Sequence, residues 1–172
     1  GVRESRRIVG EYMLTGEDVI HATKFPDVIA RGSFGIDIHC ADYTGCGITG
    51  LDLPEGQSYD IPYRCLVPQE IENLLIGGRC ISVTHIALGS TRIQPVSAAT
   101  GQAAGIAAAI SLKYGYTPRE LPYRLLRPAL IAQKINLGND AIPLMATRNI
   151  PNVGSETAHT AAASNTIVGA AK

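Results

Sequence analysis

The segment from Asn73 to Leu112 constrains the fold of this chain more than any other part of it. It opens with the apolar run Leu74-Leu75-Ile76, which stops at Gly77-Gly78. A short apolar run bounded in this way predicts a buried strand. Residues 96–112 are rich in Ala, the strongest helix former, and predict a helix despite two glycines. A buried strand, a Gly-Gly exit and a small-residue helix together indicate a nucleotide site built largely from backbone.

Small residues on this predicted helix support the same interpretation. Gly101 and Gly105 are four residues apart and share one helix face, where another backbone can come close. Ser97, Thr100 and Gly101 lie in the opening turns, where unpaired N–H groups and the positive end of the helix dipole attract anions. We therefore expect the opening of this helix to face the nucleotide.

Length and charge limit the classes of protein that this chain can represent. Its 172 residues are enough for one ordinary domain or for pieces of two. The 15 basic and 15 acidic side chains balance, so we expect neither nucleic acid nor an acidic membrane as a partner. The longest apolar stretch, residues 103–112, is too short for a membrane span.

The first residues, GVRESRRIVG, are charged and contain no initiator Met. They show no signal peptide, which favours the cytoplasm without fixing the compartment. We expect a fragment or a processed chain.

The cysteines do not predict a metal or disulfide framework. Cys40, Cys46, Cys65 and Cys80 contain no C-x-x-C pair. His39 stands beside Cys40, but the ligand spacing of zinc modules is missing, so we expect no metal site. The scattered positions predict ordinary reduced thiols.

The first part of the chain predicts strands joined by turns. Residues 7–14 and 34–39 read as strands, and residues 58–67 read as an edge or irregular strand because Pro62 interrupts them. Thr15 and the acidic residues after it predict a short capped helix that ends before Pro26.

Residues 42–57 predict a Gly-rich loop, which contains a formal G-x-G-x-x-G at Gly45–Gly50. A phosphate-binding fingerprint needs a helix directly after it, and the sequence LDLPEG that follows is a poor helix. We therefore reject a phosphate loop here and expect a hairpin or surface loop.

The last part of the chain predicts one more helix. Thr117-Pro118-Arg119-Glu120 has a capping-box pattern with Pro at the first helical position. Residues 122–134 carry Leu and Ala at helical spacing, which predicts a helix docked on the surface. Residues from 136 onward have no strong apolar period and form a tail, a linker or the start of a further module.

Five motifs follow one another in a specific order: GVRESRRIVGEYMLT, FGIDIH, YDIPYRCLVP, NLLIGGRCIS and HIALGSTRIQPVSAATGQAAGIAAAI. Their succession, over about residues 1–133, resembles the C-terminal half of the FAD-dependent oxidoreductase family. The resemblance implies a Rossmann-like FAD domain interleaved with a substrate domain that contains an antiparallel sheet. It also implies FAD as the cofactor and a small molecule as the substrate.

For this chain the resemblance implies a mixed α/β (α+β) fragment. Residues 1–68 would end the substrate domain, and residues 69–116 would form the C-terminal return of the FAD domain. Residues 117–135 would be a C-terminal helix, and residues 136–172 a tail or linker. The phosphate fingerprint of the family lies near the N-terminus of the full protein and is not in this chain. The resemblance therefore implies a partner, an N-terminal FAD-binding segment or chain that carries the phosphate loop.

The same resemblance assigns cofactor-binding residues. Two groups are expected to face the flavin: the loop after the apolar strand, and the helix opening, where N–H groups would approach the flavin O2 or the ribityl chain. These residues are Gly77, Gly78, Arg79, Thr100, Gly101, Gln102 and Ala103. Helix–sheet packing through small residues is an alternative role that does not exclude the first.

Catalytic and substrate-binding residues are expected in the neighbouring segments. His85 and Arg92 lie in a loop expected to pass near the flavin ring. His85 is expected to act as an acid/base or to hydrogen-bond the substrate, and Arg92 to anchor an anionic group or to interact with the flavin. Arg6, His39 and Tyr63 are the candidates for substrate binding. A structural histidine, an internal ion pair and solvated or buried side chains are the alternative roles.

The leading hypothesis is therefore an FAD-dependent oxidoreductase part, in which the flavin accepts a hydride from an unknown small molecule. The alternative is a non-catalytic fragment or assembly chain of the same fold without bound flavin. A third hypothesis, a thiol or metal protein, would use His39 and the four cysteines.

Overall fold

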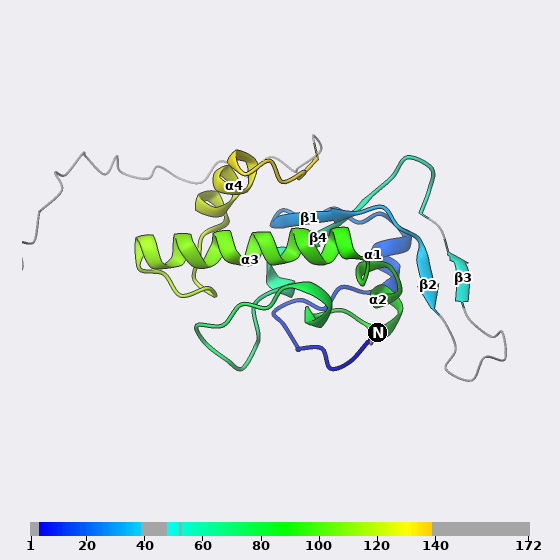
Figure 1. Ribbon diagram of the computed structural model, residues 1–172, viewed down its shortest axis with the longest axis horizontal. Helices are drawn as coiled ribbons and strands as arrows, with labels where there is room; N and C mark the ends of the chain where they lie inside the picture. Colours follow the sequence, from blue (N-terminus) through cyan, green and yellow to red (C-terminus); the bar gives the residue numbers. More distant parts are fainter. Residues whose placement is uncertain (1–3, 39–47, 52, 139–172) are drawn as a thin grey trace, which may run out of the picture.

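The structure is a computed structural model, and it describes residues 4–38, 48–51 and 53–138. These residues form a mixed α/β arrangement of helices around short antiparallel strands (Figure 1). The predicted mixed α/β class is confirmed. The elements in chain order are α1 (Gly16–Ile20), β1 (Val28–Gly32), β2 (Ile36–Ile38), β3 (Ile48–Leu51), β4 (Tyr59–Pro62), α2 (His85–Thr91), α3 (Gln94–Tyr114) and α4 (Tyr123–Ala132), with 3₁₀ turns η1 (Tyr63–Cys65) and η2 (Gly78–Cys80).

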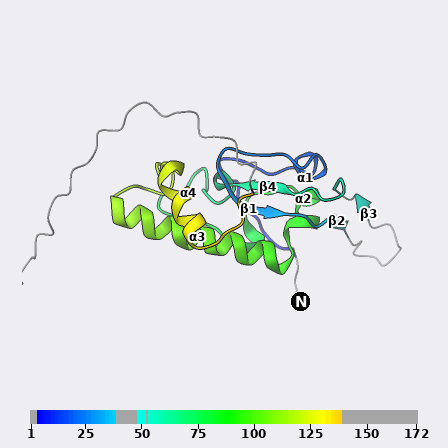
Figure 2. The ribbon, with the colours of Figure 1, turned by 90° about the horizontal axis from the view of Figure 1, so that it is seen from above.

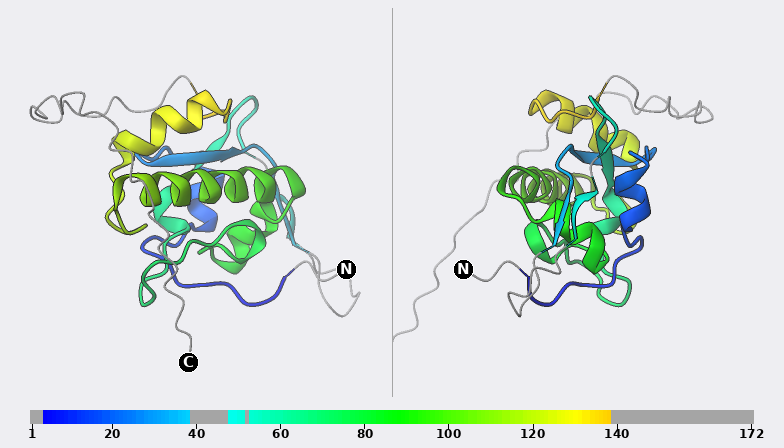
Figure 3. Two further views of the ribbon diagram at one scale, coloured as in Figure 1. Left: turned by 60° about the vertical axis from the view of Figure 1, so that its left-hand side comes forward. Right: turned by 90° about the vertical axis from the view of Figure 1, so that its right-hand side faces the viewer.

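The ribbon of β1 and β4 is the centre of the molecule. The two strands are antiparallel, with Ala30 opposite Ile61 and Gly32 opposite Tyr59. All four residues of β4 are buried, and in β1 only Arg31 is partly exposed. The ribbon is buried on both faces because α3 packs on one side and α1 lies on the other (Figures 2 and 3).

Helix α3 confirms the helix predicted from the small-residue segment. Its inward face buries Val96, Ala103, Ala107 and Ile110 against the core. It ends at Gly115, which adopts the left-handed conformation with φ of 73°. Helix α4 packs against α3 and confirms the second predicted helix.

A second ribbon, β2 with β3, lies beside α2. These strands are antiparallel, with Ile36 opposite Leu51. Strand β2 confirms the strand predicted at residues 34–39, whereas β3 lies inside the predicted loop 42–57, so that loop was partly wrong. The first half of the rejected G-x-G-x-x-G lies outside the described residues. The motif ends in β3, which pairs with β2 as the hairpin interpretation expected, and the described residues 53–58 form no helix.

The predicted cap of α1 is present. The Thr15 side chain accepts a hydrogen bond from the Asp18 N–H at 3.2 Å, and the Asp18 carboxylate accepts from the Thr15 N–H at 2.9 Å. This reciprocal pair satisfies two N–H groups that the first turn leaves without helical partners.

Three local predictions were wrong. Leu74–Ile76 is irregular instead of a strand, because no strand of the described residues lies alongside to complete a ladder. Residues 7–14 form only isolated bridges, Gly10 with Pro68 and Leu14 with Val83. The Glu120 N–H donates to the Thr117 Oγ1 as the capping box predicted, and the Thr117 hydroxyl donates to the Glu120 carboxylate. These bonds close a turn, however, and α4 begins later, at Tyr123.

Two further differences concern the central ribbon. Strand β1 had no predicted counterpart, although Val28-Ile29-Ala30 is an apolar run. The segment 58–67 is irregular as expected, since strand β4 stops at Pro62 and gives way to η1. Within the described part of the chain, no helix is long and apolar enough to cross a membrane.

Candidate functional site

The turn at Gly77-Gly78 packs directly on the backbone of α3. A Cβ atom on Gly77 would lie 2.9 Å from the Gly101 Cα, so only glycine fits at this contact. The Gly78 N–H donates to the Thr100 Oγ1 at 3.0 Å, and Gly78 has φ of +81°. The structure therefore brings together the two glycine-containing segments that were predicted to face a cofactor.

Thr100 holds this contact together. It is fully buried, and its hydroxyl lies 3.1 Å from the carbonyl oxygens of both Val96 and Ser97 while accepting from Gly78. Among the described residues, all the hydrogen bonds of this hydroxyl are therefore made within α3 or to the glycine turn. Thr100 positions the glycine turn.

Helix α3 begins two residues earlier than the predicted helix, and this changes which N–H groups lie in its first turn. The helix begins at Gln94, so Thr100, Gly101, Gln102 and Ala103 lie in its second and third turns. There each N–H bonds to the carbonyl four residues earlier. The expected donation of these N–H groups to a flavin stays a prediction. In the first turn, Gln94 and Val96 have N–H groups without helical partners, and Pro95 has no N–H.

Side chains in the same stretch have different roles. Ala103 is buried in the core, and the exposed Gln102 donates from Nε2 to the Gln133 carbonyl at 3.3 Å. Gly101 and Gly105 face open space, since a Cβ on either glycine would meet no atom within 4 Å. The outer flank of α3 is therefore open to a flat ring or to another backbone.

A hollow of about 330 Å³ opens at the N-terminus of α3. Its charged groups are Arg79, Arg92 and Asp37. The Arg92 Nη2 donates to the Asp37 carbonyl at 2.8 Å and lies 3.2 Å from its Oδ2. The Arg79 Nε donates to the Arg92 carbonyl at 2.9 Å. The remaining lining residues are Phe34, Ile93, Gln94 and Pro95.

The hollow lies beside the glycine turn and has one net positive charge, because Asp37 forms an ion pair with Arg92 and Arg79 is the second cation. Arg79 belongs to η2, directly after Gly78, and its side chain is exposed. Arg92 is the C-cap of α2 and joins that helix to β2. The predicted residues Arg79 and Arg92 thus share one hollow with the first turn of α3, where an anionic group would be stabilised.

His85 lies at the other end of α2. The predicted loop is a helix, and seven residues of helix separate His85 from Arg92 by about 10 Å. The two predicted catalytic residues therefore do not share one hollow in the described structure. The exposed His85 ring lies with Nδ1 2.8 Å from Glu4 Oε1.

Glu4 is also held by Arg7, whose Nη1 lies 2.5 Å from the same Oε1. Partial burial alone would raise the pKa of Glu4, but the hydrogen bonds and charges of His85 and Arg7 outweigh it and lower the pKa below its usual value. Sequence reasoning missed Glu4. The only local signal was its place in the charged run RESRR.

The three residues expected to bind substrate lie in different surroundings. Tyr63 is buried, its hydroxyl donates to the Pro118 carbonyl at 2.8 Å, and burial raises its pKa. Arg6 is exposed, and His39 lies outside the described residues. The described contacts bring neither Tyr63 nor Arg6 to the hollow at α3.

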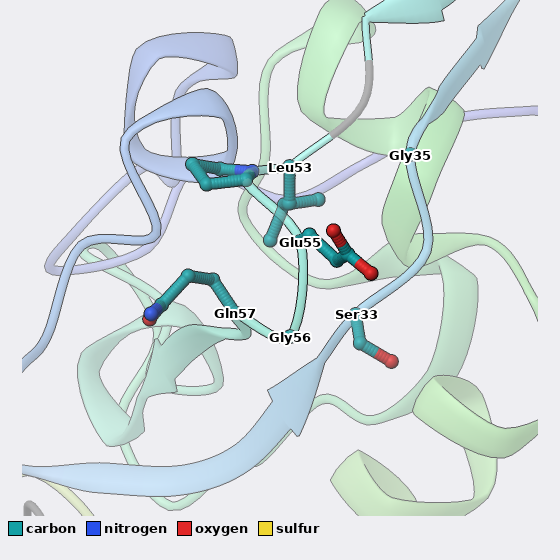
Figure 4. A pocket seen from close by; sticks show the side chains of 7 residues that line it. Ser33, Gly35, Leu53, Glu55, Gly56 and Gln57 are labelled. Carbon is teal, nitrogen blue, oxygen red and sulfur yellow. The ribbon is translucent and has the colours of Figure 1, made fainter.

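A second hollow, of about 400 Å³, lies between the end of β1 and residues 53–57 (Figure 4). Its lining includes Ser33, Leu53, Glu55 and Gln57, with the carboxylate of Glu55 as its one charged group. It has fewer charged groups that could bind a ligand than the arginine-lined hollow. Elsewhere in the described part of the chain, no group of three or more His, Cys, Asp or Glu side chains gathers as metal ligands would.

The described residues place a glycine turn on an open small-residue helix, beside a hollow whose charged groups are two arginines and one aspartate. The chain belongs to the FAD dependent oxidoreductase family, whose sequence model matches residues 1–130. FAD is the cofactor that this family implies. No curated protein and no solved structure matched the chain significantly.

Proposed function

We propose that this chain forms the C-terminal part of an FAD-dependent oxidoreductase, in which the flavin accepts a hydride from a small molecule. The contact of the Gly77-Gly78 turn with Thr100 and Gly101, inside the matched residues 1–130, carries this proposal. Such a contact needs glycine on the turn and leaves the helix flank open, which suits a flat ring lying against backbone.

The residues that would hold the cofactor follow from this geometry. Gly77 and Gly78 would offer backbone to the flavin, and the flank at Gly101 would let the ring approach α3. Arg79, Arg92 and the N–H groups of the first turn of α3 would stabilise negative charge in the hollow. When bound, FAD supplies the two-electron acceptor, and this chain supplies orientation and charge.

We further propose that an N-terminal FAD-binding segment with the phosphate loop covers the outer face of α3. This face is exposed and consists of small or apolar residues and one glutamine: Ala98, Gly101, Gln102, Gly105, Ala108, Ala109 and Leu112, the last exposed to 86%. A helix that is apolar on both sides is typical of a helix covered on both sides. The small side chains would let a neighbouring element pack close to the helix backbone.

A Gly101→Leu variant tests the proposed site. Because the Gly101 Cβ position is open, the substitution should leave the stability of this chain within about 1 kcal/mol and still block what lies against the flank. We expect the flavin absorption of the purified protein, measured per chain, to fall at least about tenfold.

Ala132→Leu is the matched control, since it places the same leucine side chain at an exposed position of α4. It should keep full flavin content. Full flavin content in Gly101→Leu as well would contradict the proposed site. No flavin in the unsubstituted protein, with an intact-mass measurement showing this chain alone, would favour the assembly chain without cofactor.

A further inference from the structure

We propose that Glu4 is a positioning residue that fixes the imidazole of His85, so that the ring presents Nε2 as a proton acceptor. The inference rests on the proposed function, in which a substrate loses a proton together with a hydride. It adds to that function a carboxylate–histidine pair from segments 81 residues apart.

The pair is held by a chain of contacts that ends on backbone. Glu4 Oε1 lies 2.8 Å from His85 Nδ1 and 2.5 Å from Arg7 Nη1. The Arg7 Nε donates to the Val83 carbonyl at 3.0 Å, two residues before His85. Arg7 therefore fixes the carboxylate relative to the start of α2.

Backbone hydrogen bonds hold the two segments together as well. The Ile8 N–H donates to the Cys80 carbonyl at 3.1 Å, and the Thr84 N–H donates to the Leu14 carbonyl at 2.9 Å. The Thr84 side chain also caps α2 by accepting from the Ala87 N–H at 3.2 Å. These bonds fix the backbone of His85, and none of them involves the Glu4 side chain.

An ionised carboxylate only accepts hydrogen bonds, so His85 must carry its proton on Nδ1 when it is neutral. Its Nε2 then has a lone pair, and among the described residues no group bonds to it. The side chain is 58% exposed, which leaves this nitrogen accessible. The orientation matches that of a general base held by a carboxylate.

The proton balance of the proposed step is complete. A substrate with an H–C–X–H group, where X is oxygen or nitrogen, gives the X–H proton to Nε2. The C–H hydrogen would leave with its electron pair as a hydride, and FAD, when bound as in the proposed function, would supply the acceptor. The product has a C=X double bond, and the imidazolium returns its proton to water.

The chain contains an ordinary histidine–glutamate pair for comparison. The Glu17 Oε2 on α1 lies 3.1 Å from the Nε2 of His21, the C-cap of that helix, and the two side chains are exposed to 78% and 71%. They are four residues apart on one helix face, and no other described group holds either side chain. Glu4, in contrast, also contacts the Arg7 guanidinium, and its side chain is 39% exposed.

The test is a ¹⁵N NMR measurement of the His85 tautomer in the full chain as purified, with its flavin content read from the same sample. We expect the Nδ1–H form in the unsubstituted protein. In Glu4→Ala the ratio of Nδ1–H to Nε2–H should fall by about tenfold or more, because a hydrogen bond to a charged group is lost.

Glu4→Gln keeps an acceptor oxygen and should therefore retain the Nδ1–H form of His85. If Glu4 only stabilised the fold, this variant would not need to retain that form. Glu17→Ala is the matched control and should leave His85 unchanged. Diethyl pyrocarbonate, which acylates neutral imidazole nitrogen, should modify His85 at Nε2, several-fold more slowly in Glu4→Ala.

An unchanged tautomer ratio in Glu4→Ala would overturn the proposal, as would an Nε2–H form in the unsubstituted protein. The flavin content tests the proposed function separately. Loss of flavin in every sample with the expected tautomers would overturn that function and leave the Glu4–His85 pair standing.

Discussion

At the scale of single residues, the buried carboxylate of Asp60 shows how this small core tolerates charge. Asp60 is 1% exposed, and its oxygens accept from the Phe25 N–H at 3.1 Å and the Arg31 Nε at 2.8 Å. Removing the Asp60 carboxylate takes away the acceptor of the Phe25 N–H and the buried ion-pair partner of Arg31. Asp60 therefore ties β1, β4 and the turn before β1 together.

We predict that Asp60→Ala lowers the free energy of unfolding by about 3–5 kcal/mol, measured by urea denaturation. The control is Asp27→Ala, which removes an ion pair with Arg64, whose side chain is 45% exposed. Water screens that pair, so the control should lose clearly less than Asp60→Ala. Equal losses in the two variants would contradict this account of Asp60.

Which residue contacts the sequence could predict depended on their separation along the chain. The Thr15–Asp18 cap is local and followed from the residue types. The contact of Gly77 with Gly101 was expected only in outline, from a family resemblance. The Glu4–His85 pair was missed, because nothing in a local pattern brings together residues that are 81 positions apart.

At the scale of elements, helices were predicted better than strands. The Ala-rich composition of α3 and the Leu spacing of α4 are properties of the segments themselves. A strand also needs a neighbour, which a local pattern does not contain. Leu74–Ile76 has the composition of a strand but no adjacent strand among the described residues, whereas Val28–Gly32 has β4 beside it.

Helix α3 offers a matched pair of glycine substitutions. Gly115 ends the helix at φ of 73°, where a side chain is strained, so Gly115→Ala should destabilise the protein by about 1 kcal/mol. Gly105 lies inside the helix with open space at its Cβ position, so Gly105→Ala should stabilise it by about 0.5–1 kcal/mol. Urea denaturation of both variants measures the two effects. A shift of the same sign in both would contradict the assigned backbone roles.

At the scale of the whole molecule, the described residues form one core, and the faces of its elements differ in how far they are buried. The ribbon of β1 and β4 is covered on both faces, and the inner face of α3 is buried with it. The outer face of α3 is equally apolar but exposed, and the arginine-lined hollow opens at the N-terminus of the same helix. The proposed cofactor contact and the proposed partner contact therefore meet on one helix.

The core also predicts how the stability of the molecule depends on pH. Burial raises the pKa of Tyr59 from 10.0 to about 12 and that of the Cys65 thiol from 9.0 to about 12, and both side chains are fully buried. Above pH 9 the unfolded chain loses protons that the folded chain keeps, so the free energy of unfolding falls as the pH rises. Each fully buried group contributes a slope of up to about 1.4 kcal/mol per pH unit.

We therefore predict that the protein is progressively destabilised between about pH 9 and 12, measured by urea denaturation at a series of pH values. Tyr59→Phe should reduce the steepness of this fall above pH 10, because phenylalanine has no hydroxyl that could ionise in the unfolded chain. At neutral pH the same variant should lose about 1 kcal/mol, since the 2.6 Å hydrogen bond between the Tyr59 hydroxyl and Ser90 Oγ is gone. A free energy of unfolding that stayed constant up to pH 11 would mean that these groups ionise in the folded protein as readily as in the unfolded chain, and that the core is open to water at the β1–β4 ribbon.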